Sequence, residues 1–411
     1  MNRSKGIRLL NAALAIALAA LLLSGCWDRQ EIEERAVVLG IGIDKASEED
    51  MKKESEISHM KGRFGAPEAK PIRVTIQIAV PGRIPLGPGS GGEGGKGGGQ
   101  NTVWVVEGRG HTLNDALNNL QQRVSPPLFY GHLRIIVVSE SVAREGIENL
   151  NDFLRRNPEI RRMNWMFISQ DKASDLMRAA PQLERVPTLY LMNTMDQSVK
   201  MGRFPDDFLG IFWSNSSAKG QEGYLPYIRL RSEDTVEIAG LAFFRGDRMV
   251  GHTTPLEIPL FMGIKGMNPA GGQVYVKLEN TSEYYMFGGR SRKSFIRAEL
   301  RDGKPHISIR ILVEGNIIEK SSDVGTLTTE QIDEIESKLS KEAAKAYSDL
   351  IKKTQAQRSD IFGFGEHVRA KKPDYWNRQV KTKETWQEMY ETLSFEITAE
   401  MHIRRIGMKA K

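Results

Sequence analysis

The chain has 411 residues, of which 40% are hydrophobic and 27% charged, and its formal net charge is +6. These values are typical of a folded protein with apolar cores, and the length allows two or three domains. Because the positive charge is mild and Lys and Arg are not gathered in long runs, no nucleic-acid-binding protein is predicted. Cys26 is the only cysteine, so an internal disulfide is excluded.

The first 25 residues have the pattern of a secretory signal peptide. Arg3, Lys5 and Arg8 supply positive charge, and residues 9–23 are Leu, Ala and Ile apart from Asn11. This apolar stretch is shorter than the roughly 20 residues that a membrane-spanning helix needs. The pattern therefore predicts a cleavable signal peptide over residues 1–25.

The segment Leu23-Ser24-Gly25-Cys26 resembles a lipobox, where signal peptidase cuts before a cysteine whose thiol has received a diacylglycerol. Two acyl chains hold a protein stably at a membrane, whereas one holds it only marginally. We therefore expect lipidation at Cys26 and a mature chain anchored on the outer face of the cell membrane. The alternatives are an ordinary secretory signal and a short anchor helix that happens to contain a cysteine.

Residues 26–187 are predicted to form an N-terminal mixed α/β domain, because strand and helix periodicities alternate along them. Thr112 and Asp115 have the spacing of a capping box. The strand, helix and strand within residues 133–169 predict a crossover connection, so these two strands should be parallel. Predicted strands span residues 36–44, 72–80, 103–106, 133–139 and 163–169, and predicted helices span 112–124, 142–155 and 173–180.

A glycine-rich stretch separates the second and third predicted strands. Gly occurs nine times between Gly87 and Gln100, and Lys96 lies among the glycines. A phosphate-binding P-loop needs Gly-Lys-Ser/Thr at the start of a helix, whereas Lys96 is followed by three Gly. The stretch is therefore interpreted as a flexible hairpin tip, because glycine is costly to order.

Residues 188–290 are predicted to form a linker and middle domain, and residues 291–411 a C-terminal α+β domain. Up to residue 224 only residues 189–195 are expected to be helical, and the rest is interpreted as a connection. From residue 236 on, the strands are expected to be antiparallel, with turns at residues 245–248 and at Asp302-Gly303.

A long helix over residues 330–355 begins at a capping box of Thr328 and Gln331, and a strand over residues 393–406 closes the chain. The predicted fold is thus a multi-domain α+β protein. A mixed N-terminal domain that contains a βαβ unit precedes antiparallel sheet domains packed with the long helix.

No motif in the sequence predicts a catalytic, cofactor-binding or metal-binding residue. The histidines are spread along the chain without a His-Glu-x-x-His pair, and lipid on Cys26 would remove the one thiol available to zinc. Neither a Gly-x-Ser-x-Gly elbow nor a dinucleotide glycine fingerprint occurs. A triad of distant residues is recognised only by geometry, but an enzyme is not predicted.

Several segments, in order along the chain, resemble the Ger(x)C family, the C subunits of bacterial spore germinant receptors. The resemblance covers nearly the whole mature chain, and the glycine-rich stretch departs from the family's pattern. The segments that carry it are the lipobox with Trp27-Asp28-Arg29 and Val37 to Asp44, Tyr130-Gly131-His132-Leu133 with residues 135–147, Phe153 to Arg161, Ala239 to Phe244 with Met249 to Gly251, Asp360 to Gly365, and Pro373-Asp374-Tyr375-Trp376 with Trp386.

The resemblance implies a three-domain lipoprotein on the outer face of the spore inner membrane. It also implies two partners, the integral membrane A and B subunits of the receptor, which the family places in germinant recognition and ion passage. It supplies no catalytic residue and no cofactor. Our leading hypothesis is therefore a non-catalytic, lipid-anchored receptor subunit. The alternative is a lipid-anchored solute-binding protein of a transporter, and a surface hydrolase is the third possibility.

The motif residues also have structural interpretations. His132 is expected to cap backbone groups at a turn, and Phe362 and Phe364 are expected to pack into the core beside glycines that allow close backbone approach. Trp376 and Trp386 are expected to pack rather than to form an exposed binding patch.

Overall fold

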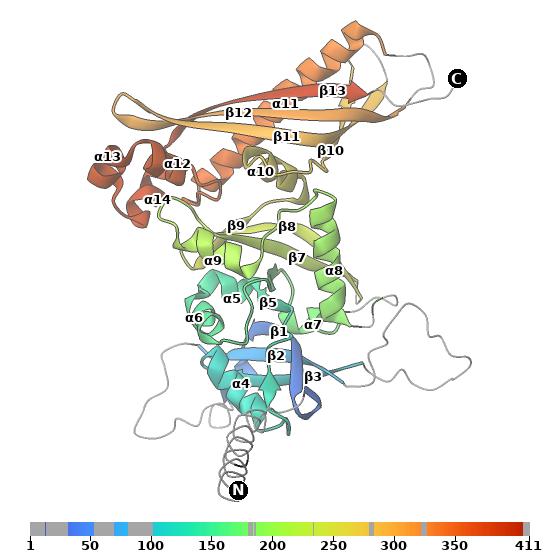
Figure 1. The fold of residues 1–411 in the computed structure, drawn as a ribbon, viewed down its shortest axis with the longest axis vertical. Coiled ribbons are helices and arrows are strands. Elements are labelled where there is room, and N and C mark those ends of the chain that lie inside the picture. The colour runs from blue at the N-terminus through green and yellow to red at the C-terminus, as the bar shows by residue number, and fades with distance from the viewer. Residues whose placement is uncertain are drawn as a thin grey trace, which may run out of the picture.

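The computed structural model describes residues 32–52, 70–80, 102–179, 186–232, 234–278, 283–321 and 327–405, together with positions 13 and 184. Two sheets lie one above the other along the long axis of the molecule (Figure 1). We call residues 32–252, which hold the nine-stranded sheet, the N-terminal body, and residues 255–405, which hold the four-stranded sheet, the C-terminal body. The domain boundaries expected from the sequence stay predictions.

The first sheet has the strand order β3-β2-β1-β5-β6-β7-β8-β9, with β4 paired to β1. The parallel pairing predicted within residues 133–169 is confirmed, since Ile135 lies opposite Trp165 and Ser139 opposite Ser169. The strands are β1 (Ala36–Lys45), β2 (Ile72–Ala79), β3 (Val103–Gly110), β4 (Leu128–Phe129), β5 (Ile135–Ser139), β6 (Trp165–Ser169), β7 (Tyr224–Ser232), β8 (Thr235–Arg245) and β9 (Arg248–His252).

The central strands are largely apolar because both faces of the sheet are covered. Alternate residues of β5 therefore enter two different cores: Ile135 and Val137 belong to one cluster, and Ile136 and Val138 belong to the other. The α7 helix lies close against β1. A Cβ atom on Gly42 would lie 3.2 Å from the carbonyl oxygen of Ala173, so only glycine fits easily there.

The predicted start of α4 is confirmed in a modified form. The Thr112 hydroxyl accepts a hydrogen bond from the Asp115 N–H, but the Asp115 carboxylate accepts from the N–H of His111 instead of Thr112. The helices of the N-terminal body are η2 (Ile32–Glu34), α2 (Glu48–Lys52), α4 (Leu113–Gln121), α5 (Glu140–Glu145), α6 (Glu148–Arg156), α7 (Ala173–Leu176), α8 (Pro187–Lys200) and α9 (Leu209–Ser217).

Two expectations for the N-terminal body are wrong. The single helix predicted over residues 142–155 is two helices, because Gly146 adopts a φ of +128° and its missing Cβ leaves room for Asp247. The stretch predicted as a connection up to residue 224 contains α9 in addition to α8. No side chain caps the start of α9 at Phe208, so the sequence carries no start signal for this short helix.

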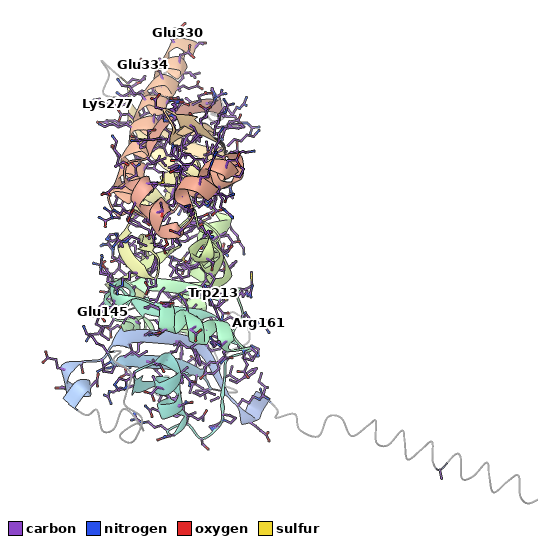
Figure 2. All side chains as sticks on the ribbon, turned by 90° about the vertical axis from the view of Figure 1, so that its left-hand side faces the viewer. Glu145, Arg161, Trp213, Lys277, Glu330 and Glu334 are labelled. Carbon is purple, nitrogen blue, oxygen red and sulfur yellow. The ribbon has the colours of Figure 1, made fainter. Side chains whose placement is uncertain are left out.

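The second sheet has the order β10-β11-β12-β13 and is covered on one face by α11. The turn at Asp302-Gly303 is confirmed, with φ values of 50° and 74°. In Figure 2, Glu330 and Glu334 mark the tip of α11 farthest from the N-terminal body. The strands are β10 (Gln273–Lys277), β11 (Tyr284–Arg301), β12 (Lys304–Lys320) and β13 (Ser394–Arg405), and the helices are η3 (Pro255–Glu257), α10 (Ile258–Ile264), α11 (Thr329–Gln355), α12 (Phe364–Lys371), α13 (Pro373–Tyr375), η4 (Trp376–Val380) and α14 (Lys383–Glu391).

The expectation of purely antiparallel pairing is wrong at one position, because β13 runs parallel to β12. Helices α11 to α14 form the crossover that returns the chain to the end at which β12 began. The outer edge of β13 is partly covered by α11. Ser340 Oγ accepts from the Met401 N–H at 3.0 Å, and Glu336 Oε1 accepts from the Ile403 N–H at 2.6 Å.

The cap of α11 leads to a stability prediction. The Thr328 hydroxyl accepts from the Gln331 N–H at 3.3 Å, and Gln331 Oε1 accepts from the Thr328 N–H at 3.0 Å. We expect Thr328→Ala to lower the free energy of unfolding by about 1 kcal/mol. Urea unfolding followed by circular dichroism measures this. The control Thr329→Ala, one residue beyond the cap, should change the value by less than about 0.5 kcal/mol, and equal losses would show that the cap contributes nothing.

Candidate functional site

Cys26 and the glycine-rich stretch from Gly87 to Gln100 lie outside the described residues, so lipidation and the flexible hairpin tip stay predictions. Within the described part of the chain, no helix is both long and apolar enough to cross a bilayer. Trp27-Asp28-Arg29 lies outside the described residues as well, and the contacts of the family-like segments from Val37 on identify two polar centres. One centre lies beside β1, and the other joins the two bodies.

The first centre begins at Asp44, the last residue of the family-like segment at β1. Its carboxylate accepts hydrogen bonds from the backbone N–H groups of Ala173 at 2.8 Å and Ser174 at 2.9 Å. These are orphan donors at the start of α7, so Asp44 satisfies them and fixes α7 to β1. Burial raises the pKa of Asp44, although these hydrogen bonds favour its ionised form.

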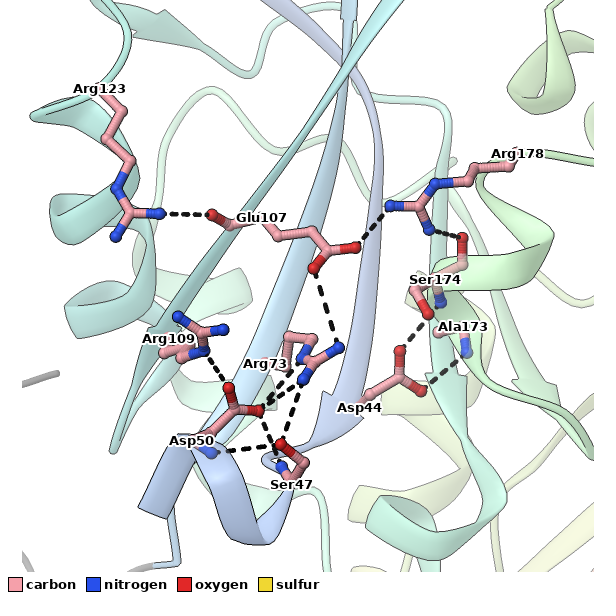
Figure 3. A network of polar contacts seen from close by, with 10 residues as sticks. All are labelled: Asp44, Ser47, Asp50, Arg73, Glu107, Arg109, Arg123, Ala173, Ser174 and Arg178. Atoms are coloured by element: carbon pink, nitrogen blue, oxygen red, sulfur yellow. Dashed lines mark hydrogen bonds and ion pairs between the residues drawn. The ribbon is translucent and has the colours of Figure 1, made fainter. Parts of the chain in front are cut away.

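Next to Asp44 lies a network of charged side chains (Figure 3). Arg73 Nη2 lies 2.7 Å from Asp50 Oδ2, and Arg109 also pairs with Asp50. Glu107 bridges Arg73 and Arg178. Burial opposes ionisation of Asp50, but the hydrogen bonds from Arg73 and Ser47 together with the charge of Arg73 outweigh it and hold the pKa of Asp50 well below its usual range. A carboxylate engaged by two guanidinium groups is a structural anchor and a poor general base.

The segments around Tyr130 and Phe153 to Arg161 contact each other. Glu159 Oε2 accepts from the Tyr130 N–H at 2.8 Å, and His132 packs edge-on against Phe129 with ring centroids 5.9 Å apart. The expected capping role of His132 stays a prediction. Beside these segments, α4, α6 and α9 line an open cleft of about 1090 Å³. Two of its charged groups already pair with each other, since Arg156 bonds Asp152 at 2.8 Å.

The second centre is the buried carboxyl of Asp360, the first residue of a family-like segment in the C-terminal body. Its oxygens accept from the N–H groups of Gly363 at 2.8 Å and Gly365 at 2.9 Å and from Trp386 Nε1 at 3.0 Å. Asp360 thereby caps the start of α12 and fixes α14 beside it. Burial raises the pKa of Asp360 to about 6, and the three hydrogen bonds oppose this rise.

Asp360 also contacts the N-terminal body, because its carbonyl oxygen accepts from the Glu222 N–H at 2.8 Å. The Glu222 carboxylate, 2% exposed, lies 3.0 Å from Lys383 Nζ. It also accepts from Gln387 Nε2 at 2.6 Å and from the Gly246 N–H at 3.0 Å. Burial raises the pKa of Glu222, and the charge of Lys383 opposes this rise. We call Glu222, Asp360, Lys383 and Gln387 the joint.

The backbones of the two bodies approach closely beside the joint. A Cβ on Gly220 would lie 2.3 Å from the carbonyl carbon of Gly365, so neither body leaves room for a side chain there. Glu366 Oε1 accepts from the Gly220 N–H at 2.7 Å. Gly363 needs its φ of +81° to start α12, and a Cβ there would meet the Gln221 side chain. Close backbone packing and hydrogen bonding therefore both hold the two bodies together.

The aromatic residues of these segments pack as expected from the sequence. Phe362 and Phe364 are buried and stack with centroids 5.3 Å apart, and Trp376 packs on Trp386 at 5.7 Å. Glu222, Lys383 and Gln387 were missed at the sequence level. These residues belong to no motif. More than 160 residues separate Glu222 from Lys383 and Gln387, so no local pattern predicts their contact.

Within the described residues, no group of three or more His, Cys, Asp or Glu side chains is placed to hold a metal ion. The buried acids of the two centres are instead engaged by hydrogen-bond donors and cations. Their arrangement fixes helices and bodies relative to one another, and it is suited to a structural role.

The raised pKa of Asp360 predicts a pH-dependent stability. Below about pH 4 the Asp360 carboxyl is protonated in both the folded and the unfolded chain. Between that pH and the folded-state pKa of about 6, only the folded chain keeps the proton, so protonation favours the folded state. The stability that Asp360 contributes is therefore present at low pH and is lost as the pH rises through 6. In Asp360→Asn, one donor loses its acceptor, which should cost about 1–3 kcal/mol.

Because Asn does not titrate, the difference in unfolding free energy between wild type and Asp360→Asn should shrink as the pH rises from about 4 to about 7. Urea unfolding at several pH values measures it, with Asp349→Asn on the exposed face of α11 as the control. A difference that stays constant over this range would contradict the raised pKa.

The pair of Glu222 and Lys383 predicts a strong coupling. Lys383→Met leaves a buried carboxylate without its cation and should lower the unfolding free energy by about 3 kcal/mol. Glu222→Gln/Lys383→Met should recover most of that loss, because no charge is then left unpaired. Limited proteolysis and urea unfolding of the single and double variants test this. Single and double variants of equal stability would mean that the pair does not hold the joint.

Comparison with known proteins places these motifs in a family. Residues 28–230 match the model described as spore germination protein N-terminal domain, and residues 239–407 match spore germination B3/GerAC like, C-terminal. The chain is 26% identical over 415 residues to the putative spore germination protein YfkR of Bacillus subtilis, with 96% of each chain covered. It is 24% identical to spore germination protein KC of the same organism, covering 97% of this chain and 96% of that one.

A solved structure shows the same fold. The crystal structure of the GerBC protein matches with a TM-score of 0.54 and 17% identity over 83% of this chain and 96% of that chain. The two family models together account for nearly all of residues 28–407, and they include both polar centres. The chain therefore belongs to the Ger(x)C family of spore germination proteins.

Proposed function

We propose that this protein is the lipid-anchored, non-catalytic C subunit of a spore germinant receptor. The observation that carries the proposal is the match of both family models, in order, along residues 28–407. Relatives named as spore germination proteins align over nearly the full length of the chain. The buried acids of the two centres are engaged in structural contacts, which fits a subunit that acts through protein contacts.

The anchor is proposed to be a diacylglycerol on Cys26. Five residues separate Cys26 from Ile32, where the described N-terminal body begins, and the six steps between the two span at most about 20 Å. The lipid would therefore hold the N-terminal body close to the outer face of the spore inner membrane.

The sheet edge near this tether supports such a placement. The amino ends of the parallel strands β1, β5 and β6 share one edge, which carries exposed Arg134, Arg161 and Arg162 and the 66% exposed Met163. Among the described residues, these three arginines have no carboxylate partner within ion-pair distance. Each cation close to an anionic membrane surface contributes about 1 kcal/mol of attraction.

The opposite edge of the sheet differs in its electrostatics. There Glu145 pairs with Lys45 at 2.7 Å, and Asp50 pairs with Arg73. Figure 2 shows Glu145 and Arg161 on opposite sides of the N-terminal body. Lys45 and Arg73 are thereby neutralised at this edge, which makes it less suited to an anionic membrane.

The proposed partners are the integral membrane A and B subunits of the receptor. Anchoring the N-terminal body at the membrane would place residues 32–252 where they can contact those subunits. The joint would keep the C-terminal body in a fixed relation to them. The role we propose for the protein is to stabilise the signalling-competent assembly.

The anchor is tested with Cys26→Ala. We expect the variant to lose incorporation of an alkyne-tagged palmitate analogue and to leave the spore membrane fraction, because the thiol that receives the lipid is gone. Ser24→Ala keeps a small residue before the cleavage site and should behave as wild type. Labelling and membrane retention of the Cys26→Ala chain would overturn the anchor.

The receptor role is tested in spores that carry this receptor alone. Deletion of the gene, or Cys26→Ala, should abolish germination in response to the nutrient that the receptor serves, while sporulation stays normal. Pull-down of the tagged chain from wild-type spore membranes should recover two integral membrane subunits. If the deletion strain germinated as well as spores that carry the intact gene, the proposal would be wrong.

A further inference from the structure

The C-terminal body contains a cleft of about 770 Å³ that the proposed function does not use. One wall is the tip of the β11–β12 hairpin, which contributes Lys304. The other wall is the segment from the end of α12 to η4, which contributes Lys371, Lys372 and Arg378 together with Asp374 and Tyr375. This wall contains the family-like segment Pro373-Asp374-Tyr375-Trp376.

The charged side chains that line the cleft are mostly positive. Four cationic side chains line it, against the single carboxylate of Asp374. Among the described residues, Lys304, Lys371 and Lys372 have no carboxylate partner within ion-pair distance, and Arg378 donates only to the backbone oxygen of Asp374, at 3.2 Å. Like charges gathered in a concave site focus a positive potential and favour the entry of anions.

The rest of this sheet shows the contrast. On its exposed face Arg310 pairs with Glu400 at 2.6 Å, and Arg301 pairs with Glu396 at 3.1 Å. The cations of the cleft lack the carboxylate partners that these two arginines have.

Local structure explains only part of this arrangement. Lys371 lies in the last turn of α12, where a cation stabilises the helix dipole. That reason does not apply to Lys304 on the hairpin or to Arg378 in η4. The wall itself is rigidly built, since η4 is a π-helix whose Trp376 packs on Trp386, and Lys381 follows with a φ of +64°. Single π-helical turns occur frequently at functional sites.

We propose that this cleft binds a small multivalent oxyanion, a molecule that carries phosphate or several carboxylate groups. Its volume lies within the range of roughly 300–1,000 Å³ that small-molecule sites occupy. Arg378 offers a planar fork for an oxyanion, and the lysines offer point charges around it. Concavity favours a small anion over an acidic protein surface, which needs a flatter and larger contact area.

The test uses the purified full-length protein and titration calorimetry at low ionic strength, with inorganic pyrophosphate and citrate as probes. We expect at least one probe to bind with one-to-one stoichiometry, and the affinity to fall as salt is raised. Lys304→Gln/Arg378→Gln takes one charge from each wall and should weaken binding at least tenfold. The control Lys341→Gln/Lys345→Gln removes two exposed cations from α11, outside the cleft, and should leave the affinity unchanged.

Asp374→Asn gives a result that misfolding cannot imitate. Removal of the one carboxylate in the cleft should strengthen binding several-fold, because the bound anion loses a repulsive neighbour. Absence of binding by both probes at millimolar concentration would overturn the proposal, as would equal losses in the cleft and control variants. A hexaglutamate peptide that binds tenfold tighter than pyrophosphate would overturn the small-anion assignment and make the cleft a site for an acidic peptide.

Discussion

The fold depends on one kind of interaction, a buried carboxylate that satisfies backbone N–H groups where distant elements meet. A buried charge is costly unless it is hydrogen-bonded, and a buried N–H group is costly unless an acceptor reaches it. Asp44 and Asp360 meet both requirements at once, each at the start of a short helix. Glu222 accepts from the Gly246 N–H within the N-terminal body and pairs with Lys383 of the C-terminal body. Since removal of either side leaves the other buried and unpaired, these contacts fix the geometry around them.

The joint holds the bodies cooperatively for the same reason. A displacement of the C-terminal body would break the contacts of Glu222 with Lys383 and Gln387 together, and it would also separate the touching backbones of Gly220 and Gly365. The alternative of a two-lobed solute-binding protein needs lobes that open around a cleft between them. A tightly bonded joint and a second sheet with different topology give that alternative no support.

Sequence patterns predicted the elements whose signals are local. The apolar run of β1, the crossover between β5 and β6, and the capping box of α11 are all found where they were expected. The errors lie where a distant contact decides the structure. Gly146 ends α5 because Asp247 occupies the space of its missing side chain, and β13 is parallel to β12 because the helices α11 to α14 intervene. The pair of Glu222 and Lys383 was not predicted for the same reason, because no sequence signal near either residue indicates that the other is its partner.

The family-like segments are largely internal, so they belong to the scaffold of the protein. Helix α12 connects this scaffold to the surface. It starts at the N–H groups that Asp360 holds and ends at Lys371 in the cationic cleft, about 12 Å away along a rigid helix. An anion that moves the cleft wall would therefore act on an element whose other end is bonded to the joint. Through Glu222, the joint is bonded in turn to the N-terminal body, so the cleft and the proposed membrane-facing edge belong to one continuously bonded structure.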